Sequence, residues 1–201
     1  MKPLLITVLL MTAALSTAET DRPHYYEIPD APEGFSGPHV AARMVDGLGF
    51  RYFWATEGLR AEDLNWSPDG GEQEGKVRRT SADTIDHIYN LALIVANATR
   101  GEPTKFPVEI EGLTFAEKRA ATLGFIKQAS DQLRAASEAD MERFDMVFVS
   151  ESGTQEHPFW NAINGPIGDA LWHTGQIVSF RRSSGNPFPS NVSLLSGKVR
   201  E

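Results

Sequence analysis

The sequence contains no cysteine among its 201 residues. Disulfides therefore cannot stabilise the fold, and any zinc site must use nitrogen and oxygen ligands instead of thiolates. The chain also lacks a cluster of lysine or arginine, and 19 basic against 27 acidic residues leave a formal charge of −8. This balance argues against nucleic acid and against anionic membrane surfaces as partners.

Long apolar runs are scarce as well, apart from Leu4–Leu15 near the start of the chain. This run is shorter than the ~20 apolar residues that a membrane-spanning helix needs. With Lys2 before it and Ser16-Thr17-Ala18 after it, the pattern is typical of a secretory signal peptide over residues 1–18. A buried N-terminal helix is the alternative interpretation. We therefore predict an exported protein, periplasmic or extracellular, without a membrane span, whose mature chain begins at Glu19 after cleavage near Ala18.

The rest of the chain is long enough for one domain with a sizeable core. Residues 19–38, with four prolines, predict an extended lead-in, residues 39–190 the folded domain, and residues 191–201 a polar C-terminal tail.

Apolar residues recur at helical spacing in four segments, near residues 40–60, 81–99, 114–137 and 160–182, the last of them bent or begun at Pro166. Thr80 or Ser81 is expected to cap the second helix, and Thr114 and Glu117 form a capping box for the third. Four such helices with non-trivial connections predict an all-α fold, an antiparallel four-helix bundle. Strands are expected only in the connections, where residues 144–149 (FDMVFV) favour a short strand or an extended segment and residues 67–79 a polar loop.

Three polar residues stand at the apolar faces of these helices. His87 lies in the second helix, and Asp169 and His173 lie in the fourth. A spacing of four residues leaves Asp169 and His173 only about 40° apart on their helix, so both side chains project from one face. Such a pair can offer two ligands to a metal ion, with room for a third from a facing helix. The alternatives are a surface interaction for this pair and a hydrogen-bonded histidine at the edge of the core for His87.

The segment Gly168–Ile177 (GDALWHTGQI), followed by Arg181-Arg182 and Gly185-Asn186-Pro187, resembles the last helix of the DinB/YfiT-like superfamily of metal-binding four-helix bundles. That helix typically reads His-x-x-x-His-x-Gly-Gln. Asp86-His87-Ile88 is similar to the family segment that supplies another histidine, and Leu59–Pro68 is similar to the end of its first helix. The resemblance spans roughly Val40 to Pro189 and is sharpest at the His-Thr-Gly-Gln block.

The resemblance implies a metal site formed by His87, Asp169 and His173. The bound ion would be a divalent transition metal, for which zinc is the first choice and nickel or iron the alternatives. The family usually has histidine at the position of Asp169, although glutamate occurs there in related thiol-dependent isomerases, and aspartate is one methylene shorter. Gln176, one turn beyond His173, is expected to support a ligand or to hydrogen-bond between helices.

Two functions follow from the resemblance. The first is a metal-dependent hydrolase or transferase with an unknown small-molecule substrate. Low-molecular-weight thiols are kept reduced mainly in the cytosol, so export favours hydrolysis. The alternative is a non-catalytic bundle that binds a small ligand or a protein partner, with the metal site lost or structural. Many relatives dimerise, so a homodimer is a further expectation.

Other residues in these segments have structural interpretations. Trp54, Trp160 and Trp172 are expected in the core. Arg181 and Arg182 suit the C-terminal end of a helix dipole, and Gly175 is expected to allow close approach of helices.

Overall fold

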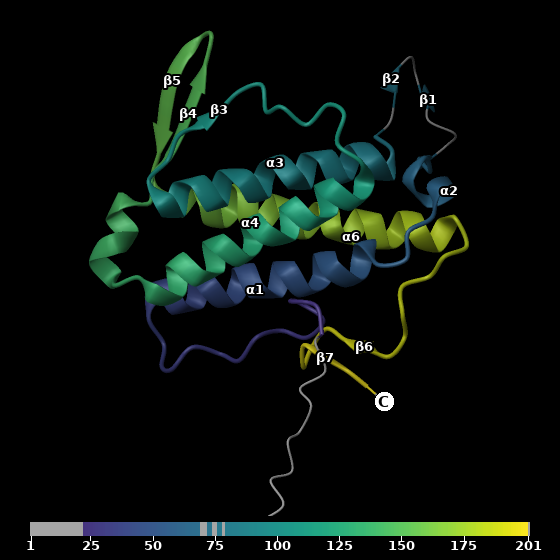
Figure 1. Ribbon diagram of the computed structural model, residues 1–201, viewed down its shortest axis with the longest axis horizontal. Helices are drawn as coiled ribbons and strands as arrows, with labels where there is room; N and C mark the ends of the chain where they lie inside the picture. Colours follow the sequence, from purple (N-terminus) through teal and green to yellow (C-terminus); the bar gives the residue numbers. More distant parts are fainter. Residues whose placement is uncertain (1–21, 69–71, 74–75, 78, 201) are drawn as a thin grey trace, which may run out of the picture.

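The computed structural model describes residues 22–68, 72–73, 76–77 and 79–200 (Figure 1). The predicted signal peptide and its cleavage point lie outside the described residues.

The chain is mostly helical, as predicted. Four long helices form its body: α1 (Gly37–Thr56), α3 (Ser81–Arg100), α4 (Phe115–Ala135) and α6 (Gly168–Ser183). Helices α4 and α6 each pack against both α1 and α3. The apolar side chains on the facing surfaces, among them Leu48, Ile88, Ile126 and Ile177, are almost completely buried.

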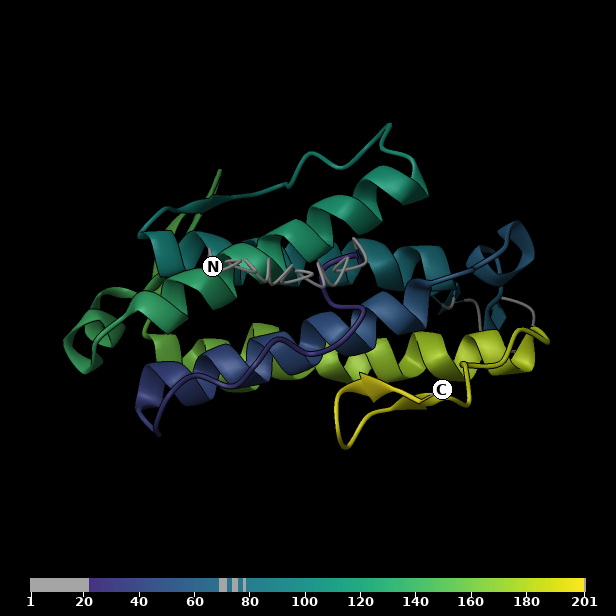
Figure 2. The same ribbon diagram turned by 60° about the horizontal axis from the view of Figure 1, so that its bottom comes forward.

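The four helices are not antiparallel throughout, which corrects the simple arrangement predicted from the sequence. Figures 1 and 2 show that α3 and α4 run in one direction and that α1 and α6 run in the other. The connection 101–114 returns along the length of the molecule, so α4 begins at the same end as α3. Fourteen extended residues reach about 45 Å, more than the ~30 Å of a twenty-residue helix, and the return is therefore possible.

Local sequence sets the ends of the helices. The Thr80 side chain accepts a hydrogen bond from the backbone of Asp83, and Thr114 does the same for Glu117, which confirms Thr80 as the cap and Thr114–Glu117 as a capping box. Helix α1 begins earlier than predicted because Ser36 caps it, with its side chain accepting from the backbone of His39. It also ends earlier, since Glu57 is extended and Gly58 follows with a φ of 67°.

Short strands occur in every connection for which a strand or loop was expected. The segment predicted as a strand forms β4 (Met146–Ser150), which pairs with β3 (Thr104–Lys105) and β5 (Gly153–His157). The sequence did not predict β5, whose residues are polar and exposed. The predicted loop contains the strands β1 (Glu72–Gln73) and β2 (Lys76–Val77), and the predicted tail contains β6 (Val192–Ser193) and β7 (Lys198–Val199).

The lead-in contains no helix in its described part before Gly37, and both it and the tail pack against the rest of the domain, which the sequence had not indicated. The lead-in runs along α1 (Figure 2), and the ring of Tyr25 is buried there. A Cβ at Gly49 would stand 2.6 Å from that ring, so only glycine admits it, despite the low helix propensity of glycine. Ile28 donates its backbone N–H to Gly197 at 2.9 Å, which joins the lead-in to the tail hairpin.

A buried acid holds the lead-in against two helices. Asp46 of α1 is 1% exposed and accepts hydrogen bonds from Tyr25, Ser130 and Arg134. Arg134 also donates to the backbone oxygen of Asp30. Because the burial of Tyr25 and the Asp46 carboxylate both disfavour a phenolate, they raise the pKa of Tyr25. The negative charge of the buried Asp46 is therefore compensated by the guanidinium of Arg134.

The structure corrects three further interpretations. Trp54 is buried, but Trp160 and Trp172 are 77% and 73% exposed and lie outside the core. A Cβ at Gly175 would meet open space, so close approach of helices does not explain this glycine. Arg181 is buried and donates to backbone oxygens at the end of α1, so it does more than complement the end of its own helix.

None of the helices in the described part of the chain has an apolar stretch of membrane-spanning length.

A short helix, α2 (Ala61–Leu64), links α1 to the end of α6 through a buried carboxylate. The side chain of Asp63 is fully buried, and its oxygens accept from Arg60, Ser184 and Asn186. These hydrogen bonds hold the pKa of Asp63 well below its ordinary value. The bond with Arg60 has the largest effect, and those with Ser184 and Asn186 have smaller ones.

This shift predicts a specific acid sensitivity. A carboxylate whose pKa is lower in the folded state stabilises the fold fully above its ordinary pKa, and the stabilisation is lost as the pH falls through the folded pKa. We expect the free energy of unfolding, measured by urea titration, to fall steeply below about pH 4. In Asp63→Asn the fall should be shallower, because the amide does not titrate. Glu62→Gln, a change at an exposed neighbour in α2, should keep the wild-type profile, and equal slopes in all three proteins would contradict the assignment.

Candidate metal centre

Two packed helices bring the three predicted ligands together. His87 lies in the second turn of α3, and Asp169 and His173 lie in the first two turns of α6. The two helices pack against each other. Asp86, the neighbour of His87, faces α4 instead and forms an ion pair with Lys118 at 2.7 Å. Only the histidine of this pair is therefore directed to α6.

The ligand atoms converge as the sequence predicted. Nε2 of His87 lies 3.1 Å from Oδ2 of Asp169, and Nε2 of His173 lies 3.3 Å from Oδ1 of the same carboxylate. One ligand atom from each residue lies within 4.8 Å of the other two. Ligand atoms that surround zinc at ~2.0–2.1 Å in tetrahedral geometry are about 3.3 Å apart, so each histidine nitrogen already stands at this spacing from the carboxylate. The shorter side chain of aspartate thus reaches both histidines.

Gln176 determines which nitrogen of His173 faces this point. Its Oε1 lies 2.6 Å from Nδ1 of His173. An amide oxygen only accepts hydrogen bonds, so this contact requires a proton on Nδ1 of His173, and Nε2 is the nitrogen that faces Asp169. This is the tautomer in which a histidine ligates a metal through Nε2.

The resulting arrangement favours a positive charge at its centre. The lone pair of His173 Nε2 and a carboxylate oxygen at 3.3 Å repel each other unless a cation lies between them. A proton on Nε2 satisfies this one pair. A divalent ion would satisfy the pair, and His87, whose Nε2 lies 3.1 Å from Oδ2 of Asp169, would be a third residue able to hold it. The donor set, two imidazoles and one carboxylate, therefore fits zinc, iron or nickel.

The site is open on one side. The side chain of His173 is 13% exposed and that of His87 is 28% exposed, whereas Asp169 is 43% exposed. The two rings meet edge to face, with centroids 4.7 Å apart, which limits their rotation. The carboxylate is thus the most accessible of the three side chains, and solvent reaches the cluster from its side.

A distortion of the backbone precedes the two candidate ligands of α6. A π-helical turn, η3 (Ile163–Ile167), joins α5 (Phe159–Ala162) to α6, and Pro166 lies inside it. The fourth helix is thus bent at Pro166, as predicted. Gly168 donates its N–H to the oxygen of Ile163, and a Cβ on Gly168 would stand 3.2 Å from that oxygen. The turn places Asp169 directly after a widened helix, a feature that recurs at functional sites. The Asn-Gly-Pro sequence at residues 164–166 is the signal from which it could have been anticipated.

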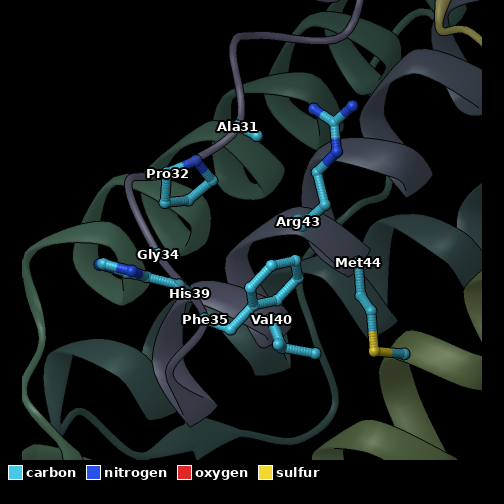
Figure 3. Close-up of a pocket in the computed structure, with 8 residues that line it drawn as sticks. All are labelled: Ala31, Pro32, Gly34, Phe35, His39, Val40, Arg43 and Met44. Atoms are coloured by element: carbon cyan, nitrogen blue, oxygen red, sulfur yellow. The ribbon is translucent and has the colours of Figure 1, made fainter.

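A groove elsewhere in the molecule contains none of these residues. It has a volume of about 440 Å³ and lies between residues 31–35 and the start of α1 (Figure 3). Figure 3 shows the imidazole of His39 directed away from Phe35 and Met44, and Arg43 donates to the backbone oxygen of Pro29 at 2.6 Å. Metal-ligating groups do not converge there.

Comparison of the chain with protein-family models, with curated proteins and with solved structures finds no match.

Proposed function

We propose that this protein is a DinB/YfiT-like four-helix bundle that binds a divalent transition metal through His87, Asp169 and His173. One observation carries the proposal. Two Nε2 atoms from different helices face the two oxygens of one carboxylate, and Oε1 of Gln176 lies 2.6 Å from the opposite nitrogen, Nδ1, of His173. Zinc is our first choice of ion, with nickel and iron as alternatives.

We further propose that the bound metal serves hydrolysis or group transfer on a small molecule. A divalent ion held by three protein ligands can lower the pKa of a water at an open position towards neutrality. The protein's contribution is to orient the two imidazoles, with Gln176 hydrogen-bonded to Nδ1 of His173, and to leave the Asp169 side chain accessible to solvent. Export of the chain, after removal of residues 1–18, is part of the same proposal.

A second candidate function is a bundle that binds a ligand or partner without catalysis. Within the described residues, the cluster contains only the three ligating side chains and no further histidine, aspartate or glutamate that could act as a general base. In that case the metal would serve structure or ligand binding alone.

The metal content of the exported protein tests the proposal. We expect protein recovered from the extracytoplasmic fraction to have the mass of residues 19–201 and to contain about one transition-metal ion per chain, measured by elemental analysis. An apoprotein that takes up no zinc, nickel or iron on reconstitution would refute the metal site. Metal-loaded protein that hydrolyses no ester, amide or phosphoester in a substrate panel would favour the second candidate function.

A further inference from the structure

A second cavity lies at the end of the helices where α1 begins, away from the metal-ligating residues. It has a volume of about 390 Å³, which is sufficient for a small molecule, and none of the three metal-ligating residues lines it. The 3₁₀ helix η2 (Glu138–Arg143) and α5 contribute most of its walls. The apolar part includes Met141, Phe159 and Trp160, and the acidic part consists of Glu138, Glu142 and Asp145.

Two aromatic residues, Phe159 and Trp160, line the cavity, and the larger of them, Trp160, is mostly exposed to solvent. Phe159 is 4% exposed and packs edge to face on Phe144, whereas Trp160, the next residue of α5, is 77% exposed. An indole in water forgoes most of the stabilisation that its burial would bring. An exposed indole at the wall of a cavity of ligand size is therefore a feature of binding sites.

The charges of the cavity have one sign. Glu138 is already engaged, since its Oε1 accepts the backbone N–H of Gly37 at 2.8 Å. In the part of the chain that the structure describes, Glu142 and Asp145 form no ion pair, and no lysine, arginine or histidine lines the cavity. Arg143, the residue after Glu142 in the chain, is paired with Asp140. Two carboxylates thus face the cavity without a compensating cation.

We propose that this cavity binds an alkylammonium group, carried by a free amine or by a lysine side chain of another protein. A cation over the face of an indole is attracted by the ring quadrupole, and the carboxylates of Glu142 and Asp145 add a direct Coulombic attraction. The apolar wall formed by Met141 and Phe159 suits the methyl or methylene groups of such a cation better than a hydrated metal ion. The inference does not depend on the metal centre, because the two sites share no residue.

Calorimetric titration with choline and with its neutral isostere 3,3-dimethylbutan-1-ol tests the cavity. We expect choline to bind at least about tenfold more tightly than the alcohol, because shape and apolar area are the same and only the charge differs. Equal affinity for the two compounds, or no binding of choline, would overturn the proposal. Nα-acetyl-lysine amide, which keeps the charged ε-ammonium group, serves as the second probe. Tighter binding of the lysine derivative identifies a protein side chain as the source, tighter binding of choline identifies a small-molecule ammonium compound, and both results support the shared chemistry.

Variants separate this cavity from other exposed aromatic surfaces. Trp160→Ala should weaken choline binding about tenfold, and the double change Glu142→Gln with Asp145→Asn should weaken it by a similar factor. Trp172→Ala removes an equally exposed tryptophan outside the cavity and should leave the affinity unchanged. Because both tryptophans are mostly in solvent, neither substitution should unfold the protein. If Trp160→Ala binds choline as the wild type does, or if Trp172→Ala loses the same affinity, the assignment is wrong.

Discussion

His173→Ala is expected to abolish stoichiometric metal binding and to leave the helices folded. His173 is the least exposed of the three ligands and contacts both Asp169 and Gln176. Loss of a partner that only orients a ligand typically costs 10–100-fold in metal affinity, so loss of the ligand itself should cost more than about 100-fold. The fold should persist because the buried apolar faces of the four long helices provide most of the burial. Zinc titration by calorimetry and far-ultraviolet circular dichroism measure the two effects.

The matched control is His157→Ala, since His157 lies in β5, outside the cluster. It should bind zinc as the wild type does. If His173→Ala retains wild-type affinity, the proposed centre does not exist, and if the variant unfolds, the metal or the histidine is structural.

Gln176 provides an independent check on the same centre. Gln176→Leu should lower zinc affinity by about 10–100-fold, because the Nδ1–H of His173 loses its acceptor. Gln176→Glu keeps an acceptor oxygen and should restore most of the affinity. Nitrogen-15 chemical shifts of the His173 ring report its tautomer directly. An unchanged tautomer in Gln176→Leu would show that the glutamine does not position the ligand.

Arg181→Met is expected to destabilise the protein by roughly 3 kcal/mol or more. Arg181 is 3% exposed, and its Nη1 lies within hydrogen-bonding distance of the oxygens of Trp54, Ala55 and Glu57, at 2.9, 3.1 and 3.1 Å. These carbonyls lie at the C-terminal end of α1, where no further helical N–H is available to them. The arginine of α6 therefore completes the end of a different helix, and burial lowers its pKa from the ordinary value for arginine.

A methionine at this position is similar in length but offers no donor, so several buried carbonyls would lack a partner. For a chain of this size, a loss of about 3 kcal/mol corresponds to a fall in Tm of roughly 6–12 °C. Arg182→Met changes the exposed neighbour and should alter stability by less than about 0.5 kcal/mol. Thermal unfolding followed by circular dichroism measures both, and equal Tm values for the two variants would show that the contacts of Arg181 contribute little.

Local sequence was sufficient for the long helices and for the pairing of two of the three candidate ligands. Threonine caps, capping-box partners and an apolar stripe act within one or two turns, and this is why α3 and α4 begin at Ser81 and Phe115. The pairing of Asp169 with His173 is also local, because four residues on one helix fix their angular separation. The choice of His87 as the third residue depended on resemblance to a family, since its distance from α6 is not encoded in its own helix.

Tertiary structure decided the contacts between residues that are far apart in the chain. The direction of α4 depends on the path of the connection 101–114, and periodicity contains no information on direction. The position of Tyr25 against Gly49, and the pairing of the lead-in with the tail, depend on surfaces that exist only after the helices have packed. The solvent exposure of Trp160 and Trp172 could not be anticipated either, since composition favours burial and only the packed structure shows which positions have no neighbour. Thus the sequence by itself determined the helices and the chemistry they carry, whereas packing determined which side chains meet, because burial is a property of the assembled helices.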